Sequence, residues 1–111
     1  MDKEIKKNMS HKPLIHFAHA NGVPARVYSK LFDLLKDQYD VIYTPIIGSD
    51  HRYPITNGWT YLADQVIDSI VQQAQGRKVI ALGHSLGAVL SLLASNKRPE
   101  LFEQVILLDP P

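Results

Sequence analysis

The stretch VIALGHSLGAVLSLLAS, residues 79–95, constrains this chain more than any other part of its sequence. An apolar run ends in the turn GHSLG over residues 83–87, and a second apolar run follows at once. A strand that becomes a helix within so few residues forces a strained backbone on the central residue, Ser85. Side chains two residues to either side would clash, so glycine at both places is a steric requirement. The pattern predicts a strand, a turn that exposes the Ser85 hydroxyl, and a helix over 86–97 that is apolar on most faces and therefore buried.

Other apolar segments indicate strands that alternate with helices. Short continuous apolar runs predict strands over residues 14–20, 39–47, 79–82 and 105–108. Because such runs lack a polar face, the strands are expected to be covered on both sides, as in a parallel sheet. The order β-α-β-α-β-α-β with right-handed crossovers therefore predicts an α/β fold.

Two further helices are predicted between these strands. Pro24 suits the first turn of one helix, because the missing N–H costs nothing there. Apolar residues in steps of three and one over residues 59–74 predict the longest helix. Thr56 or Asn57 can cap its start, and Gly76 can end it.

The length, net charge and amino-acid composition exclude several classes of function. The 111 residues suffice for one domain, and a net charge of +1 with scattered basic residues gives no footprint for nucleic acid. The absence of cysteine excludes disulfides and thiolate catalysis. No apolar run approaches the ~18 residues of a membrane span, and the start of the chain has no apolar signal segment. We expect a cytoplasmic protein with a polar tail over 1–12 and a core domain over 13–111.

Two segments resemble the α/β-hydrolase superfamily, in the half of its core that carries the nucleophile. GHSLGAVLSLLASNKRPELFEQVILLDPP is close to that family's nucleophile elbow, helix and following strand, and HFAHANGVPARVY is similar to its oxyanion loop. The resemblance covers nearly all of residues 13–111. It implies a three-layer sandwich, a partial α/β-hydrolase fold, in which four parallel strands numbered along the chain lie in the order 2-1-3-4.

Four residues are the candidate catalytic set. Ser85 is the predicted nucleophile, and the Leu86 N–H lies at a helix N-terminus, where the dipole favours an oxyanion. The resemblance implies that the Asn21 N–H is the second oxyanion donor, with Ala20 standing where the family more often has glycine. It also offers Asp109 as a candidate triad acid; the alternative is a residue that caps or shapes the strand end. A nucleotide-binding glycine loop fits less well, because the P-loop lysine and the third dinucleotide glycine are missing.

Histidines at other positions have structural interpretations. We expect His84 to pack the elbow, and His19 to shape its loop or otherwise to contact substrate. His16 is expected to be a buried histidine with its hydrogen bonds satisfied, and His51 to be exposed in a loop. No histidine spacing indicates a metal site, so neither metal nor cofactor is expected.

The general base of the family comes late in its chains, and no residue up to 111 takes that position. The resemblance therefore implies a serine hydrolase acting on a small-molecule ester or another acyl compound, with an incomplete triad as given. The superfamily also includes C–C hydrolases, thioesterases and peptidases. The alternatives are a hydrolase fragment, a non-catalytic remnant or interaction module, and a site that a partner chain completes. As given, the chain is expected to show no meaningful turnover.

The last predicted strand, 105–108, is expected to be an apolar sheet edge. The helix over 86–97 would also lose part of its cover. We therefore expect the isolated chain to be poorly soluble, to self-associate through this strand, or to be stabilised by the rest of a parent protein. Because Ile106 is expected to face a helix layer, a lysine there should not prevent association.

Overall fold

The computed structural model of the protein describes residues 12–56 and 58–111. Its four strands form one parallel sheet in the spatial order β2-β1-β3-β4, which confirms the predicted order. The strands are β1 (Leu14–Ala18), β2 (Asp40–Tyr43), β3 (Val79–His84) and β4 (Phe102–Leu108). The carboxyl ends of all four therefore meet at one edge of the sheet.

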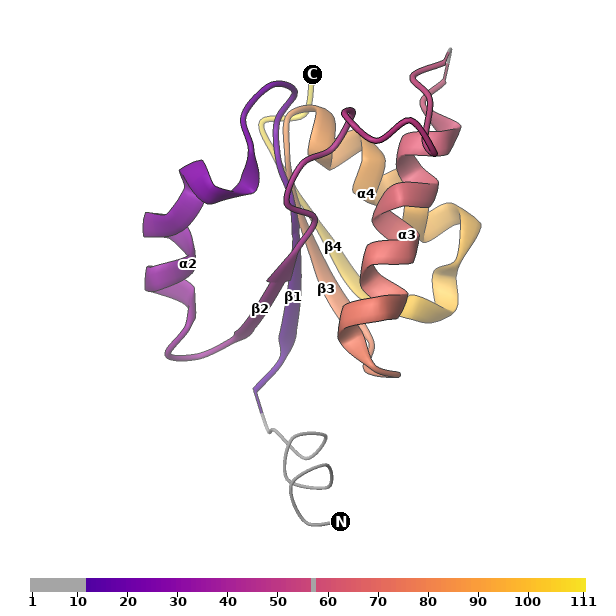
Figure 1. The fold of residues 1–111 in the computed structure, drawn as a ribbon. Coiled ribbons are helices and arrows are strands. Elements are labelled where there is room, and N and C mark those ends of the chain that lie inside the picture. The colour runs from indigo at the N-terminus through magenta and orange to yellow at the C-terminus, as the bar shows by residue number, and fades with distance from the viewer. Residues whose placement is uncertain (1–11, 57) are drawn as a thin grey trace.

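Helices cover both faces of this sheet, as Figure 1 shows. On one face a short 3-10 helix, η1 (Ala25–Tyr28), leads into α2 (Ser29–Leu35). On the other lie α3 (Thr60–Ala74) and α4 (Leu86–Lys97), and the 3-10 turn η2 (Pro99–Leu101) leads from α4 into β4. The molecule is a three-layer α/β sandwich, as predicted.

Each pair of layers encloses its own apolar core. The larger core contains the stripe of α3, with Leu62, Val66 and Ile70 each at most 2% exposed. The smaller core centres on Phe17, whose ring lies 4.4 Å from that of Tyr28, centroid to centroid. The apolar stripe of α3 and the apolar residues of the strands are thus buried, as the sequence pattern predicted.

Strand ends differ from the predicted ones for two reasons. β1 and β2 are shorter than predicted because the chain turns into loops after Ala18 and Tyr43. β4 begins three residues earlier than predicted, at Phe102. Glu103 and Gln104 are exposed in this edge strand, so the apolar pattern of a covered strand does not extend over them.

Ile106 corrects one expectation. Its side chain is 37% exposed and belongs to neither core, so no helix layer covers it. α4 also departs from the prediction, because Leu92 is 45% exposed while Leu90 and Ala94 are buried. Apolar surface is therefore open on both β4 and α4.

The start of α3 differs from the predicted cap. Trp59 is the N-cap residue, with a left-handed φ of 53° and no side-chain cap hydrogen bond. Its N–H donates to the Thr56 carbonyl at 3.1 Å, so Thr56 contacts the start of the helix through its backbone. Asn57, the other predicted cap, lies outside the described residues. At the far end Gln75, with φ 53°, precedes Gly76, with φ 87°.

The predicted tail lies, except for Lys12, outside the described residues. The Lys12 carbonyl accepts a hydrogen bond from Arg77 Nη2 at 2.6 Å, and Arg77 Nη1 lies 3.0 Å from Asp40 Oδ2. Through Arg77, Lys12 is thus held near Asp40, the first residue of β2. Within residues 12–56 and 58–111, no helix combines the length and hydropathy that crossing a bilayer requires.

Candidate active site

Ser85 occupies the turn between β3 and α4, at the carboxyl edge of the sheet. Its φ of 54° and ψ of −117° are unfavourable for a residue with a side chain, so the predicted strain is confirmed. The Ser85 N–H donates to the Leu108 carbonyl at 2.9 Å, which ties the turn to the end of β4. The surrounding structure therefore stabilises a backbone conformation that an isolated peptide would not keep.

The two glycines of the turn are sterically required, as predicted. A Cβ on Gly83 would run into the carbonyl oxygen of Gly87. A Cβ on Gly87 would run into the Ala18 carbonyl oxygen and lie 2.7 Å from that of His19. The start of α4 therefore packs directly against the backbone at the end of β1.

The predicted oxyanion donors lie at this same edge. Leu86 is the first residue of α4, and the first N–H groups of a helix have no partner within it. Asn21 follows β1 by three residues and is exposed. Because Ala18 is paired in register with Gly83, the loop that carries Asn21 and the turn that carries Ser85 leave the sheet side by side.

Tyr28 links these two segments. Its hydroxyl accepts a hydrogen bond from the Ala20 N–H at 3.1 Å and contacts His84 Nδ1 at 2.9 Å. The rings of Tyr28 and His84 pack edge to face with centroids 5.8 Å apart. His84 therefore packs the elbow, as predicted, whereas sequence reasoning did not identify Tyr28.

His19 shapes the loop, as predicted, through both ring nitrogens. Nε2 accepts the Ile47 N–H at 2.7 Å, so the proton resides on Nδ1, which donates to the Ala20 carbonyl at 2.7 Å. Burial lowers the pKa of His19, partly offset by the Ala20 hydrogen bond, and this agrees with a neutral ring. His19 thus joins the loop after β1 to the loop after β2.

His16 corrects the expectation of a fully satisfied ring. Its Nε2 lies 2.9 Å from Thr44 Oγ1, but Nδ1 has no hydrogen-bond partner among the described residues. Complete burial, opposed by a weaker backbone interaction, lowers the pKa of His16 to about 3. The ring is therefore neutral and structural at ordinary pH.

Neither base nor acid is assembled around Ser85 in the described residues. His51 is exposed in its loop, as predicted, and the other described histidines make the contacts given above. Asp109 is exposed, with a φ of 50°, and hydrogen-bonds to none of those histidines. No group of three or more metal-binding side chains occurs in the described part of the chain.

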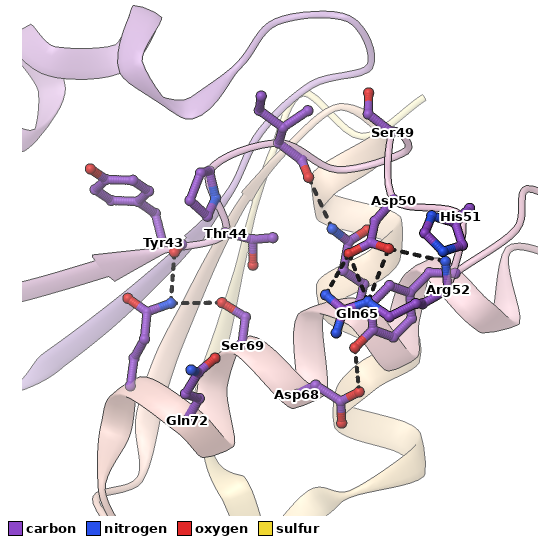
Figure 2. A pocket seen from close by; sticks show the side chains of 14 residues that line it. Tyr43, Thr44, Ser49, Asp50, His51, Arg52, Gln65, Asp68, Ser69 and Gln72 are labelled. Carbon is purple, nitrogen blue, oxygen red and sulfur yellow. Dashed lines mark hydrogen bonds and ion pairs between the residues drawn. The ribbon is translucent and has the colours of Figure 1, made fainter.

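A cavity of about 1090 Å³ opens elsewhere, between the end of β2 and α3 (Figure 2). Tyr43, Thr44 and Gln65 are among its lining residues, and none of the four candidate catalytic residues is. At its floor Gln73 Nε2 donates to the Tyr43 carbonyl at 2.8 Å. The candidate acyl site is thus separate from this hollow.

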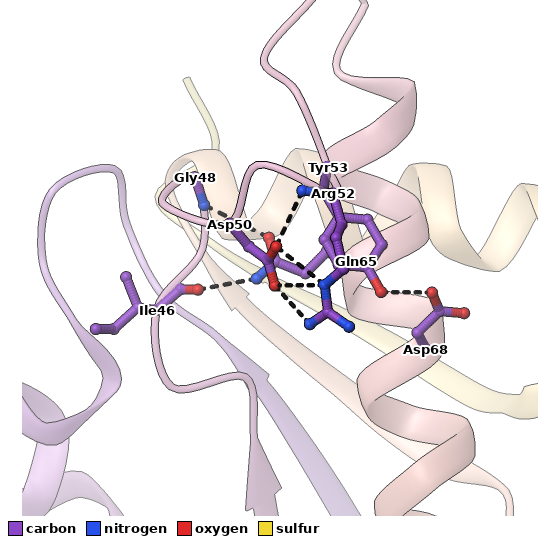
Figure 3. A network of polar contacts seen from close by, with 7 residues as sticks. All are labelled: Ile46, Gly48, Asp50, Arg52, Tyr53, Gln65 and Asp68. Atoms are coloured by element: carbon purple, nitrogen blue, oxygen red, sulfur yellow. Dashed lines mark hydrogen bonds and ion pairs between the residues drawn. The ribbon is translucent and has the colours of Figure 1, made fainter.

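Polar contacts fasten the loop after β2 to α3 (Figure 3). Arg52 lies 2.7 Å from Asp50, and their hydrogen bond lowers the pKa of Asp50 to about 2. The Tyr53 hydroxyl donates to Asp68 at 2.6 Å, which raises the pKa of Tyr53. Gln65, 8% exposed, donates to the Ile46 carbonyl at 2.9 Å.

Sequence reasoning missed this network. The one feature of the sequence that could have indicated it is Gln65, a polar residue beside the apolar stripe of α3.

Comparison with known proteins agrees with this architecture. A family model described as "Putative esterase" matches residues 36–111. The uncharacterized hydrolase YugF of Bacillus subtilis (strain 168) is 34% identical over 84 residues, 73% of this chain and 30% of that protein. Karrikin insensitive 2 receptor B of Petunia hybrida is 30% identical over 112 residues, 93% of this chain and 40% of that protein.

A solved structure gives the same result. The crystal structure of Paleococcus ferrophilus monoacylglycerol lipase matches with a TM-score of 0.71 and 25% identity, over 89% of this chain and 40% of that one. The chain thus spans 30–40% of the length of the proteins it matches here.

Proposed function

Because the chain belongs to the α/β-hydrolase superfamily, we propose that it supplies the nucleophile and oxyanion hole of a serine hydrolase for small-molecule esters. The observation that carries the proposal is the strained turn. Ser85 holds a positive φ at a strand-to-helix junction that only glycine neighbours permit. Ser85 is half-buried, and strained backbone of this kind clusters at functional sites.

The proposed reaction is acyl transfer. Ser85 Oγ bonds to the ester carbonyl carbon while its proton passes to a general base, and the N–H groups of Leu86 and Asn21 hold the oxyanion. The C–O bond to the alcohol breaks, and the base returns the proton to the leaving oxygen. Water then repeats the sequence, which releases the acid and restores Ser85.

The base is proposed to be a histidine, as in the family, and none of the described histidines takes that role. His19 and His84 are committed to other hydrogen bonds, and His16 is buried beneath the sheet surface. Asp109 follows β4 at the same edge as Ser85 and is the proposed partner of that base. Support for an ester substrate comes from the matching esterase model and the monoacylglycerol lipase structure.

The test uses a fluorophosphonate probe, which bonds to a serine oxygen as fluoride leaves. Without a nearby base, we expect slow labelling of the 111-residue chain, faster when imidazole is added as an external base. Ser85→Ala should abolish the label. Ser49→Ala, at an exposed loop serine, should leave it unchanged.

Intact mass spectrometry measures the labelled fraction. Labelling that survives Ser85→Ala would refute the nucleophile. No labelling even with imidazole would favour the non-catalytic module.

A further inference from the structure

His19 contacts the peptide group that carries one of the proposed oxyanion donors. The Ala20 carbonyl and the Asn21 N–H belong to a single planar peptide group and point in opposite directions. His19 Nδ1 donates to that carbonyl at 2.7 Å, and the Val23 N–H donates to it at 3.0 Å, which closes the turn over residues 20–23. The direction of the Asn21 N–H is therefore fixed through the Ala20 carbonyl.

The other ring nitrogen of His19 binds a residue that is itself fastened to α3. Nε2 accepts the Ile47 N–H at 2.7 Å. Gln65 of α3 binds both neighbours of Ile47, because its Nε2 donates to the Ile46 carbonyl at 2.9 Å and its Oε1 accepts the Gly48 N–H at 3.5 Å (Figure 3). Ile47 also packs in the larger core. A displacement of the His19 ring is therefore taken up by the loop after β1.

Only a neutral ring fits between these two partners. The Ile47 N–H is a backbone donor and cannot act as an acceptor, so Nε2 must carry no proton. A protonated imidazole has a proton on both nitrogens, and its Nε2–H would point at the Ile47 N–H, donor against donor. His19 is 2% exposed, so little water can replace the lost interaction. Protonation therefore requires the ring to leave this position.

The surroundings of His19 contain few groups that could titrate in its place. Burial lowers the pKa of His19, the Ala20 hydrogen bond opposes this effect, and no charged side chain of the described residues contributes. The start of α4, residues 86–91, has no titratable side chain. The other neighbouring elements contribute His16 from β1, Tyr28 from η1, His84 from β3, Asp50, His51, Arg52 and Tyr53 from the loop after β2, and Asp64 and Asp68 from α3.

We propose that His19 is a proton-controlled positioning residue, whose neutral ring directs the Asn21 N–H into the oxyanion hole and whose protonated ring releases the loop. As the pH falls below the ordinary histidine pKa of about 6.5 and through the lower pKa of His19, the ring leaves Ile47. The Ala20 peptide group then turns, and the Asn21 N–H turns with it. The effect on catalysis rests on the function proposed above, whereas the movement of the loop does not.

Nuclear magnetic resonance tests the movement of the loop. At pH 7 the side-chain nitrogen shifts should show a proton on His19 Nδ1 and none on Nε2. As the pH is lowered, the amides of Ile47 and Asn21 should shift together with the His19 ring, while the Ala81 amide, within β3, stays in place. Amides that stay in place while the ring titrates would overturn the proposal, as would a ring that stays neutral until the chain unfolds.

Labelling of Ser85 by the fluorophosphonate, with imidazole at a fixed concentration, tests the effect on catalysis. His19→Asn takes up no proton, and its side-chain amide can still donate to the Ala20 carbonyl. Dividing the rate of the parent by that of His19→Asn at the same pH cancels the titration of imidazole. This ratio should be constant above pH 7 and fall below it, by at most about tenfold per pH unit for one proton.

His51→Asn, at an exposed ring, is the matched control, and the ratio of the parent to this variant should not change with pH. A constant ratio of the parent to His19→Asn would overturn the proposal. If no variant takes up the label, the proposed function fails, and the amide shifts still confirm or overturn the movement of the loop. Far-UV circular dichroism shows whether each variant is folded, and the amide shifts of the parent decide if His19→Asn is not.

Discussion

Tyr28 and His19 determine the shape of the proposed oxyanion loop at the scale of single residues. Tyr28 connects the Ala20 N–H to the ring of His84, and His19 connects Ala20 to Ile47. Each side chain thus joins segments that are distant in the sequence. The loop backbone is held from two sides before any ester binds, which is the preorganisation that an oxyanion hole requires.

Replacing Tyr28 by phenylalanine tests this link. The ring packing remains, but the Ala20 N–H loses its acceptor, so the free energy of unfolding should fall by about 1–2 kcal/mol. The amide of Ala20 should exchange faster with deuterium, and labelling of Ser85 should slow. Tyr39→Phe is the matched control, and equal exchange in both variants would contradict the proposed link.

Roles that depend on neighbouring residues could be predicted from the sequence. His84 is adjacent in the sequence to the predicted nucleophile, and His19 lies in the segment predicted to be the oxyanion loop. Their structural roles could therefore be inferred from their positions in the sequence. Tyr28 could not be found, because its contact with His84 spans 56 residues of sequence. The lack of a hydrogen-bond partner for His16 Nδ1 could not be predicted either. A sequence pattern predicts that a residue is buried, but it does not predict which polar groups surround it.

At the scale of elements, the contact between α4 and β1 depends on Gly87. Gly87→Ala would place a methyl group against the backbone carbonyls of Ala18 and His19 at the end of β1. Overpacking against backbone is relieved only by moving the helix, so we expect a loss of about 3 kcal/mol in unfolding free energy. Urea denaturation measures it. Asn96→Ala, exposed in the same helix, should change stability by less than about 0.5 kcal/mol.

The elements themselves were largely predictable, and their ends were not. The strand, turn and helix around Ser85 followed from the two apolar runs and from the steric requirement for glycine between them. The start of β4 was missed because an edge strand tolerates Glu103 and Gln104 on open faces. The start of α3 was missed because Trp59 has a left-handed backbone conformation, which is unusual for a residue with a large side chain.

For the whole molecule, His16 makes stability depend on pH. Its pKa is about 3 when folded and about 6.5 when unfolded, so the unfolded chain binds more protons between these values. The His16 contribution is therefore complete above pH 6.5 and is lost as the pH falls toward 3. Between pH 7 and pH 5 the loss should be about 2 kcal/mol in the free energy of unfolding.

Urea denaturation of His16→Leu at both pH values tests the assignment. Its stability should change less between pH 7 and pH 5 than that of the parent, by about the same 2 kcal/mol. His51→Ala, at an exposed ring, should keep the parent's pH dependence. A parent and a His16→Leu variant with identical pH dependence would assign the effect to other groups.

The contact between Gln73 and the Tyr43 carbonyl has a consequence for strand addition at the β2 edge. A strand that joined this end of β2 would need the Tyr43 carbonyl as an acceptor, and Gln73 Nε2 already donates to it at 2.8 Å. Pro45, two residues further on, has no N–H to offer to such a strand. A new strand would therefore have to displace an existing hydrogen bond before it gained one. A glutamine of α3 thereby protects the end of β2 against edge-to-edge pairing.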